Sequence, residues 1–444
     1  MEIIIIGASF AGLAAAVEAR KTYPRANICL IDQEKEVGYF PNAFNWRMKN
    51  RISTWEEATC QLYEEVVASD IELLLETRFL SLSQEENVIQ ISQNGQVKSL
   101  SFNYLILAMG SCQVWEYQSQ DSRERMLSCK SKREALAAFE NVATAKKIAV
   151  IGAGQIGLET IDALSEYPFE LQLIESQEWP LAKYFDQEMT EFILEELDRR
   201  NIKTYFGQTV NRLGIKDGSL VCETYEESIQ ADFGLLATNF RPNSQLLQGQ
   251  LELDPDGCLV VDAFLETSRP GVFAVGDLIR LPFAFFGQAY LPMINHAILT
   301  GRLAVANLQE KKRPLKDVVR IVSSRIFGVN MTSVGLTEKE AQLWLDTDVF
   351  RIQQPYSQWD KEKLDFKLVL SQTDGRLLGG QLISKSDHLA QMNQLAFAIQ
   401  QGLRIEDLLQ QSWLCLPQQT ALVPILIEAA NYYYHDRRRR EGDL

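Results

Sequence analysis

The chain has 444 residues, of which 46% are hydrophobic and 23% charged, so it is too long for one ordinary core and too apolar to be disordered. We expect two or three packed domains. With 44 Lys and Arg against 59 Asp and Glu, the net charge of −15 opposes binding to nucleic acid or to anionic lipid.

Cysteine and histidine usage narrows the chemistry further. The seven cysteines form no C-x-x-C pair and no cluster with metal-ligand spacing, which favours a cytoplasmic protein without disulfides or a bound metal. The only histidines are His296, His388 and His435, so no Ser-His-Asp triad can be built before residue 296. A hydrolase is therefore disfavoured.

Residues 3–12 read IIIIGASFAG, which is typical of a buried strand, a glycine turn and the start of a helix. The helix continues to Lys21, and a second strand at 28–31 ends in Asp32, 25 residues after Gly7. The pattern recurs at 148–157 as IAVIGAGQIG, and the strand at 171–174 ends in Glu175, 23 residues after Gly152. The chain therefore contains an internal repeat.

The spacing within each copy has a physical reason. The first glycine makes a tight turn, the third position lets backbone approach a pyrophosphate, and the last glycine lets the helix pack close to the strand. These positions are Gly7, Ser9 and Gly12 in the first copy and Gly152, Gly154 and Gly157 in the second. The helix N-terminus attracts phosphate. The acid that ends the second strand can accept hydrogen bonds from ribose hydroxyls. Two complete copies favour two dinucleotide sites over plain βαβ units.

A later segment, residues 271–277, reads GVFAVGD and predicts a buried strand that ends in Asp277. Ligands bind at this edge of α/β sheets. Taken alone, an aspartate that closes a surface turn would be the better explanation of Asp277.

Together these motifs resemble the pyridine nucleotide-disulfide oxidoreductases, which are FAD- and NAD(P)-dependent flavoprotein reductases. The matching segments are GASFAG with Asp32, LILAMGS at 105–111, GAGQIG with Glu175, and VFAVGD at 272–277. The resemblance implies FAD in the first copy, NAD(P)H in the second, and Asp277 on the ribityl chain. It implies FAD contacts from Gly7, Ser9, Phe10, Ala11, Gly12, Asp32, Ala108, Met109, Gly110, Gly276 and Asp277, and NAD contacts from Gly152, Gly154, Gln155, Ile156, Gly157 and Glu175.

The resemblance also implies an α/β fold of three domains. An FAD-binding domain, residues 1–112 and 245–316, is interrupted by an NAD(H)-binding domain, residues 113–244. An α+β dimerisation domain, residues 317–444, would follow and form a homodimer. Asp374–Gly375 between two apolar runs independently predicts a β-hairpin in this last domain.

Within the family, the chain looks most like the NADH oxidases, NADH peroxidases and coenzyme A-disulfide reductases, but it departs from them. These relatives carry a redox-active cysteine ten residues after the acid that binds the FAD ribose, and the oxidases and peroxidases have a histidine in the first glycine loop. Here the cysteine position is Asn42, or Ala43 after a shift of one residue, and the histidine position is Phe10. A carboxamide cannot form a sulfenic acid or a mixed disulfide. Cys29, Cys60 and Cys112 are more simply explained as buried small hydrophobes.

The motif expected to bind NADH, the hydride donor, is intact. Glu175 is followed by Ser176, Gln177 and Glu178. This run offers no Arg to a 2′-phosphate and its acids repel one, so NADH is expected over NADPH. His296, on a helix predicted to start near Pro292 and to point at the flavin, is a candidate proton donor; a helix-surface or interface role is the alternative.

The sequence thus predicts an FAD enzyme that takes hydride from NADH and passes electrons directly from the reduced flavin to a small-molecule acceptor. The acceptor is dioxygen, giving hydrogen peroxide, or a quinone or another carrier. One alternative is a catalytically silent FAD- and NADH-binding sensor. A second is a thiol/disulfide reductase or peroxidase that uses an unrecognised cysteine.

Overall fold

The computed structural model describes residues 1–115, 119–238, 240–355, 362–387, 389–413 and 423–441. His388 and Cys415 lie outside these described residues. The chain divides into two compact units. Unit 1 comprises Met1–Glu116, Leu127–Thr144 and Thr238–Asp317, and unit 2 comprises Tyr117–Met126, Ala145–Ala237 and Val318–Leu444.

Unit 1 is built around a parallel sheet in which strands distant in sequence are neighbours. The spatial order is β18 (Val272–Ala274), β7 (Tyr104–Leu107), β1 (Glu2–Ile6), β2 (Asn27–Ile31) and β3 (Glu72–Leu74). The apolar runs predicted as buried strands form its centre, since Ile3 and Ile5 are fully buried. This sheet brings the ends of β1, β2, β7 and β18 to one edge.

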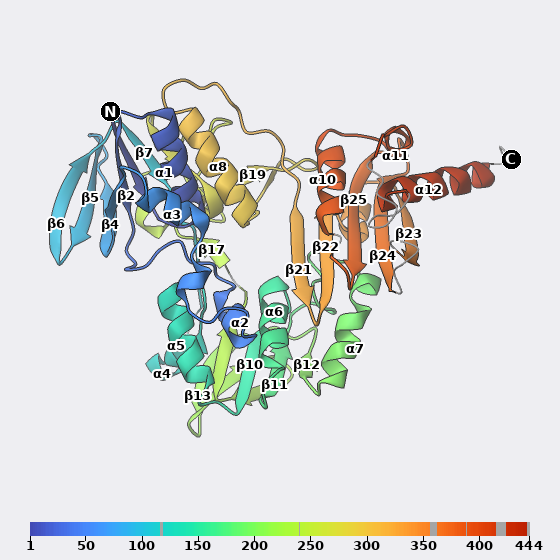
Figure 1. Cartoon of the computed structure of the whole chain (residues 1–444). Coiled ribbons are helices and arrows are strands. Elements are labelled where there is room, and N and C mark those ends of the chain that lie inside the picture. Colours follow the sequence, from blue (N-terminus) through green and yellow to red (C-terminus); the bar gives the residue numbers. More distant parts are fainter. Residues whose placement is uncertain (116–118, 239, 356–361, 388, 414–422, 442–444) are drawn as a thin grey trace. The chain divides into compact units, whose positions relative to one another are not determined.

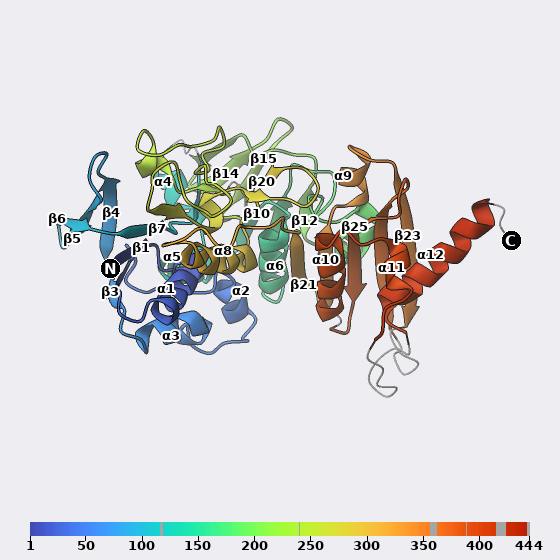
Figure 2. The same cartoon turned by 90° about the horizontal axis from the view of Figure 1, so that it is seen from above.

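Helices α1 (Phe10–Thr22) and α8 (Ile294–Ala306) pack against each other and lie side by side in both views (Figure 1, Figure 2). The alanine-rich α1 is buried along most of its length because it lies between other elements of unit 1. Unit 1 also contains α2 (Ala43–Met48), α3 (Gln61–Val67), α5 (Lys132–Val142), and the strands β4 (Thr77–Leu82), β5 (Val88–Gln93), β6 (Gln96–Ser101), β8 (Ser111–Gln113), β17 (Phe240–Pro242), β19 (Leu281–Pro282) and β20 (Gln288–Ala289).

Unit 2 contains a second parallel arrangement that begins with the second glycine motif. The sheet order is β12 (Lys203–Tyr205), β11 (Glu170–Ile174), β10 (Lys147–Ile151), β16 (Phe233–Leu236) and β9 (Met126–Leu127). Other elements here are α4 (Gln120–Glu124), α6 (Gln155–Leu164), α7 (Glu191–Arg199), β13 (Arg212–Lys216), β14 (Ser219–Glu223) and β15 (Ser228–Ala231).

The C-terminal part of unit 2 is an antiparallel sheet with helices. Its strand order is β21 (Ile321–Ile326), β22 (Val329–Gly335), β25 (Leu377–Ser384), β24 (Lys363–Ser371) and β23 (Thr347–Pro355). The predicted hairpin is confirmed, because β24 pairs with β25 around Gly375, whose φ is +70°. Helix α10 (Met392–Gln400) packs on β22 and β25, and the remaining helices are α9 (Glu338–Gln342), α11 (Ile405–Leu408) and α12 (Ile425–Glu441).

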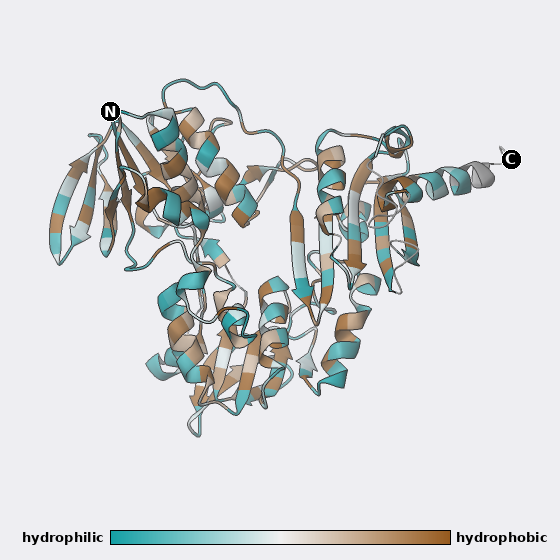
Figure 3. Cartoon of the chain, in the orientation of Figure 1, coloured by the Kyte–Doolittle hydropathy of each residue, from teal (hydrophilic) through white to brown (hydrophobic). Residues whose placement is uncertain are grey.

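Hydropathy follows this layering. Strands β10 and β25 are apolar along most of their length (Figure 3), as expected for strands covered on both faces. The α/β fold predicted from the sequence is confirmed. The finer domain bounds at residues 112, 245 and 317 stay a prediction, and residues Leu127–Thr144 cluster with unit 1.

Candidate functional site

The first glycine turn connects β1 to α1 and requires glycine at two positions. Gly7 has a φ of +103°, and a Cβ there would lie 2.3 Å from the carbonyl oxygen of Ala108. A Cβ at Gly12 would lie 1.7 Å from the carbonyl oxygen of Gly7. A side chain at either position would therefore push the helix away from the turn.

The N-terminus of α1 faces outward from this turn. Ser9 is the N-cap residue, is exposed, and its hydroxyl makes no capping hydrogen bond. Phe10 and Ala11 begin the helix and are buried. The first N–H groups of a helix have no partner within it, so this end offers donors to an anion.

The carboxylate of Asp32 is held in place by hydrogen bonds from the backbone, one of them from the first glycine turn. Its Oδ2 accepts the N–H of Ala8 at 2.7 Å, and its Oδ1 accepts the N–H of Glu34 at 2.9 Å. Burial raises the pKa of Asp32, although these two hydrogen bonds oppose the shift. A carboxylate accepts about four hydrogen bonds, so Asp32 keeps capacity for ribose hydroxyls.

A cavity of about 740 Å³, which was not foreseen from the sequence, is lined in part by Gln33 and Glu34, the residues that follow Asp32. This volume fits the adenosine part of a dinucleotide. Its walls come from the residues after β2 and from α5, which lies about a hundred positions further along the chain. The lining residues are Gln33, Glu34, Lys35, Glu36, Glu76, Arg78, Arg133, Leu136, Ala137 and Glu140.

The other predicted FAD contacts gather at the same sheet edge. Ala108, Met109 and Gly110 follow β7, and Asp277 follows the neighbouring strand β18. The hydroxyl of Ser111 donates to Oδ2 of Asp277 at 2.7 Å, which connects the two segments. Asp277 is therefore part of this edge rather than an isolated surface residue.

The second glycine turn repeats the geometry of the first. Gly152 also has a φ of +103°, and a Cβ at Gly157 would lie 1.8 Å from the carbonyl oxygen of Gly152. Ala153 donates its N–H to Oε2 of Glu175 at 2.6 Å, just as Ala8 donates to Asp32. The internal repeat is thus one of structure as well as of sequence.

The residues that follow this second turn differ in exposure. Gly154 is the N-cap of α6, and a Cβ on it would meet open space. Ile156 is 41% exposed. Gln155 donates from Nε2 to the carbonyl oxygen of Ser323 at 2.8 Å, so a strand of the C-terminal sheet holds its side chain.

Aromatic side chains fill the region of the predicted redox position. The Phe10 ring lies 5.2 Å from that of Phe40, which lies 5.4 Å from that of Trp46. Asn42 is the N-cap residue of α2, between Phe40 and Trp46 in sequence. The Phe10 ring, at one of the two positions that depart from the oxidases, thus packs in a row with Phe40 and Trp46, which flank the other position, Asn42, in sequence.

Cysteine chemistry around this cluster is limited by burial. Cys60 is buried and donates its N–H to the carbonyl oxygen of Gly38 at 2.8 Å, and burial raises the pKa of its thiol. Burial likewise raises the pKa of Cys29, Cys222 and Cys258 to about 12 and raises that of Cys129. The six described cysteines form no disulfide.

His296 lies in the first turn of α8 and is buried, with Nδ1 3.4 Å from the carbonyl oxygen of Leu291. A helix-surface role is therefore wrong for this side chain. The helix begins at Ile294, two residues later than predicted, because Met293 is extended at φ −133°.

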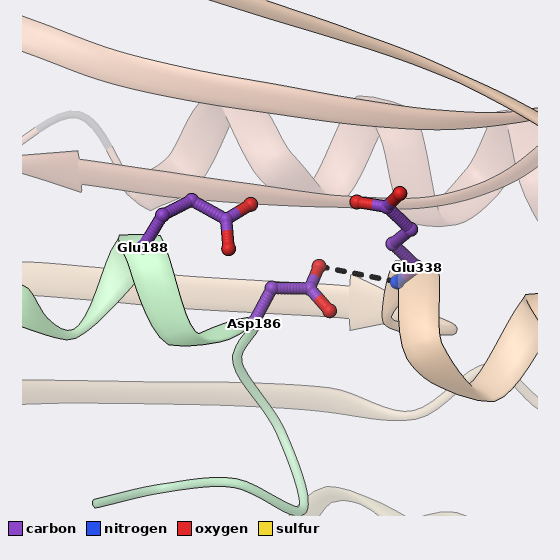
Figure 4. Close-up of side chains that lie close together, drawn as sticks. All are labelled: Asp186, Glu188 and Glu338. Carbon is purple, nitrogen blue, oxygen red and sulfur yellow. Dashed lines mark hydrogen bonds between the residues drawn. The ribbon is translucent and has the colours of Figure 1, made fainter. Parts of the chain in front are cut away.

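Three carboxylates in unit 2, those of Asp186, Glu188 and Glu338, lie close enough together to hold a cation (Figure 4). The ammonium of Lys367 contacts all three. An internal ammonium group therefore already occupies the position between these carboxylates, and the group gives no reason to propose a metal site.

Comparison with known proteins supports the fold and gives the family. Residues 1–301 match the model of the family described as pyridine nucleotide-disulphide oxidoreductase, and residues 322–423 match that family's dimerisation domain. An NADH oxidase of Enterococcus faecalis is 24% identical over 417 residues, which cover 92% of this chain and 94% of that protein. An NADH oxidase of Lactococcus lactis is 26% identical over 420 residues with the same coverage.

Solved structures give the same result. A pyridine nucleotide-disulfide family oxidoreductase from Enterococcus faecalis V583 is 31% identical and superposes with a TM-score of 0.86. The match covers 98% of this chain and 99% of that protein. The water-forming NADH oxidase of Lactobacillus brevis, bound to NADH, shares the fold at a TM-score of 0.92 and 23% identity, with 99% of each chain covered.

Among the helices that the structure describes, none is long and apolar enough to cross a membrane. The family model spans more than half of the chain. The protein therefore belongs to the pyridine nucleotide-disulphide oxidoreductase family and is an NAD(P)H-dependent flavoprotein oxidoreductase.

Proposed function

We propose that this enzyme takes a hydride from NADH onto FAD and passes both electrons directly to a small-molecule acceptor, without a cysteine relay. When bound, FAD supplies the two-electron chemistry, and the protein supplies binding, orientation and electrostatics. With dioxygen as the acceptor, the balanced reaction is NADH + H⁺ + O₂ → NAD⁺ + H₂O₂. A quinone is an alternative two-electron acceptor.

The observation that carries this proposal is the aromatic cluster of Phe10, Phe40 and Trp46, whose last two members flank Asn42 in sequence. The resemblance implies a histidine and a redox cysteine at the positions of Phe10 and Asn42. None of these four side chains can form a disulfide or a sulfenic acid. The cluster therefore favours direct transfer from the flavin to the acceptor.

Cys60 is the strongest candidate for a substitute thiol, since its N–H binds the loop that leads to Phe40. A thiol reacts as its thiolate, and burial raises the pKa of Cys60. Burial therefore disfavours the thiolate form of Cys60. The same reasoning disfavours Cys29 and Cys129.

For the cofactor sites, we propose that the first glycine turn, Asp32, residues 108–110 and Asp277 bind FAD, and that the second glycine turn and Glu175 bind NADH. The open space beside Gly154 and the cavity next to Asp32 fit dinucleotides. Glu175 and Glu178 would repel a 2′-phosphate, which favours NADH over NADPH. The match of residues 322–423 to a dimerisation domain supports a homodimer.

The deciding experiment is an anaerobic titration of the FAD-loaded enzyme with NADH, following the flavin absorbance. Bleaching that is complete after about one equivalent per FAD indicates that FAD is the only two-electron centre. A second equivalent would reveal a thiol centre and contradict the proposal. If Cys60→Ser abolished that second equivalent, Cys60 would be the missing thiol.

Two further measurements separate the alternatives. Catalase added during oxygen consumption should return about half of the oxygen if the product is hydrogen peroxide. No returned oxygen would indicate water and overturn the peroxide assignment.

A protein that is never bleached by NADH, or that shows no turnover with dioxygen or quinones, would instead be a silent binding module. Asn42→Cys serves as a matched variant that adds a thiol at the redox position.

A further inference from the structure

Lys130 is a basic residue in unit 1 that the proposed reaction does not use. It lies just before α5, and its ammonium contacts a single residue twice, at the hydroxyl and the carbonyl oxygen of Ser111. The distance from Nζ to Oγ of Ser111 is 2.6 Å. The ammonium also lies 5.4 Å from the centre of the Phe240 ring.

The Ser111 hydroxyl connects Lys130 to Asp277 through two hydrogen bonds. An ammonium group has three donors and no acceptor, so the Ser111 hydroxyl must accept a hydrogen bond from Lys130. A hydroxyl has one proton, and Ser111 donates it to Oδ2 of Asp277 at 2.7 Å. Lys130 therefore fixes the direction of a two-step chain that ends on the Asp277 carboxylate.

The surroundings show that this arrangement is held in place. Tyr290 donates its hydroxyl to the main-chain oxygen of Asp277 at 3.2 Å, which fixes the backbone beneath the carboxylate. Burial lowers the pKa of Lys130, while the charge of Asp277 opposes that shift. In the part of the chain that the structure describes, Oδ1 of Asp277 receives no hydrogen bond and so can accept one from a ligand.

We propose that Lys130 is a positioning residue for FAD, acting through Ser111 to orient Asp277 so that its free oxygen accepts a ribityl hydroxyl. This inference rests on the proposed function, which places the ribityl chain at Asp277. Without the ammonium, the Ser111 hydroxyl can rotate away, and the carboxylate loses a fixed donor and a compensating charge. The site would then have to be ordered when FAD binds.

The test measures FAD binding to the apoprotein by quenching of FAD fluorescence. Lys130→Met and Ser111→Ala are each expected to raise the Kd for FAD about tenfold, which corresponds to the loss of one charge-assisted hydrogen bond. Lys130→Arg keeps a donor and should restore most of the affinity. Lys98→Met is the matched control, since it removes an exposed lysine from β6 of the same unit and should leave the Kd unchanged.

The double variant distinguishes positioning from a general effect on folding. If Lys130 acts through Ser111, the Lys130→Met/Ser111→Ala protein should bind FAD no more weakly than the weaker single variant. Additive losses, or a Lys130→Met protein with the wild-type Kd, would overturn the inference. If Lys130→Met fails to fold, Ser111→Ala and Lys130→Arg still carry the test. Wild-type apoprotein that does not bind FAD would refute the proposed function instead.

Discussion

The ammonium of Lys367 lies 2.9 Å from Oδ2 of Asp186, and both side chains are almost completely buried within unit 2. Asp186 also accepts hydrogen bonds from the Gln381 side chain at 2.6 Å and from the N–H of Glu338 at 3.1 Å (Figure 4). A lysine of the C-terminal sheet and an aspartate that follows the second glycine motif thus neutralise each other. Breaking such a pair leaves one buried charge without a partner.

Replacing Lys367 with Met should therefore destabilise the protein by about 3–5 kcal/mol. The loss exposes three neighbouring carboxylates to mutual repulsion without their shared cation. Urea unfolding measures the change in free energy. Lys339→Met is the control: this exposed lysine lies 4.6 Å from the Trp179 ring, and its loss should cost less than about 1 kcal/mol. Equal losses in both variants would contradict this view of Lys367.

The same lysine predicts a pH dependence at the alkaline end. Burial alone lowers the pKa of Lys367, but hydrogen bonds to Glu188, Glu338 and Asp186 outweigh it and raise the pKa above the ordinary 10.5. A raised folded-state pKa means that this contribution is complete below about pH 10 and is lost as the pH rises through the folded pKa. The difference in unfolding free energy between the wild type and Lys367→Met should narrow only above about pH 10.5.

Substitutions in the two glycine turns should weaken the binding of FAD and of NADH separately. In Gly12→Ala the added Cβ meets the carbonyl of Gly7, so the purified protein should lack FAD. In Gly157→Ala the clash occurs at the second turn, so FAD should stay bound while reduction by NADH slows at least about tenfold. Flavin absorbance and stopped-flow reduction check both, and each variant is the control for the other. Normal reduction of Gly157→Ala would argue against an NADH site at this turn.

Glu175 should set the preference for NADH. Removing its carboxylate in Glu175→Ala takes away the proposed ribose acceptor and part of the repulsion toward a 2′-phosphate. We expect the KM for NADH to rise about tenfold, while that for NADPH falls or stays the same. Steady-state kinetics with both cofactors decide the matter, with Asp32→Ala as the comparison, because that change should affect FAD content rather than the NADH/NADPH ratio.

Short sequence motifs were sufficient to predict much of this fold. Both glycine motifs, the acids after the second strands and the Asp374–Gly375 hairpin are short-range signals, and the structure places each as expected. The contacts of Ser111 with Asp277 and of Glu188 with Lys367 could not be predicted, because these residues are 166 and 179 positions apart. Packing across the fold, which one sequence does not encode as a pattern, decides such contacts. Without those contacts the sequence indicates only that Lys130 is basic.

Asp32 and Glu175 each accept an N–H from their own glycine turn. Each carboxylate is therefore oriented as the chain folds, and its rotational freedom is lost then rather than on binding. At the proposed dinucleotide sites a ribose would meet a carboxylate that needs no rearrangement, so its hydroxyls would gain their hydrogen bonds without an added ordering cost. This preorganisation, present in both halves of the repeat, predicts that the affinity for dinucleotides depends little on side-chain motion at either acid.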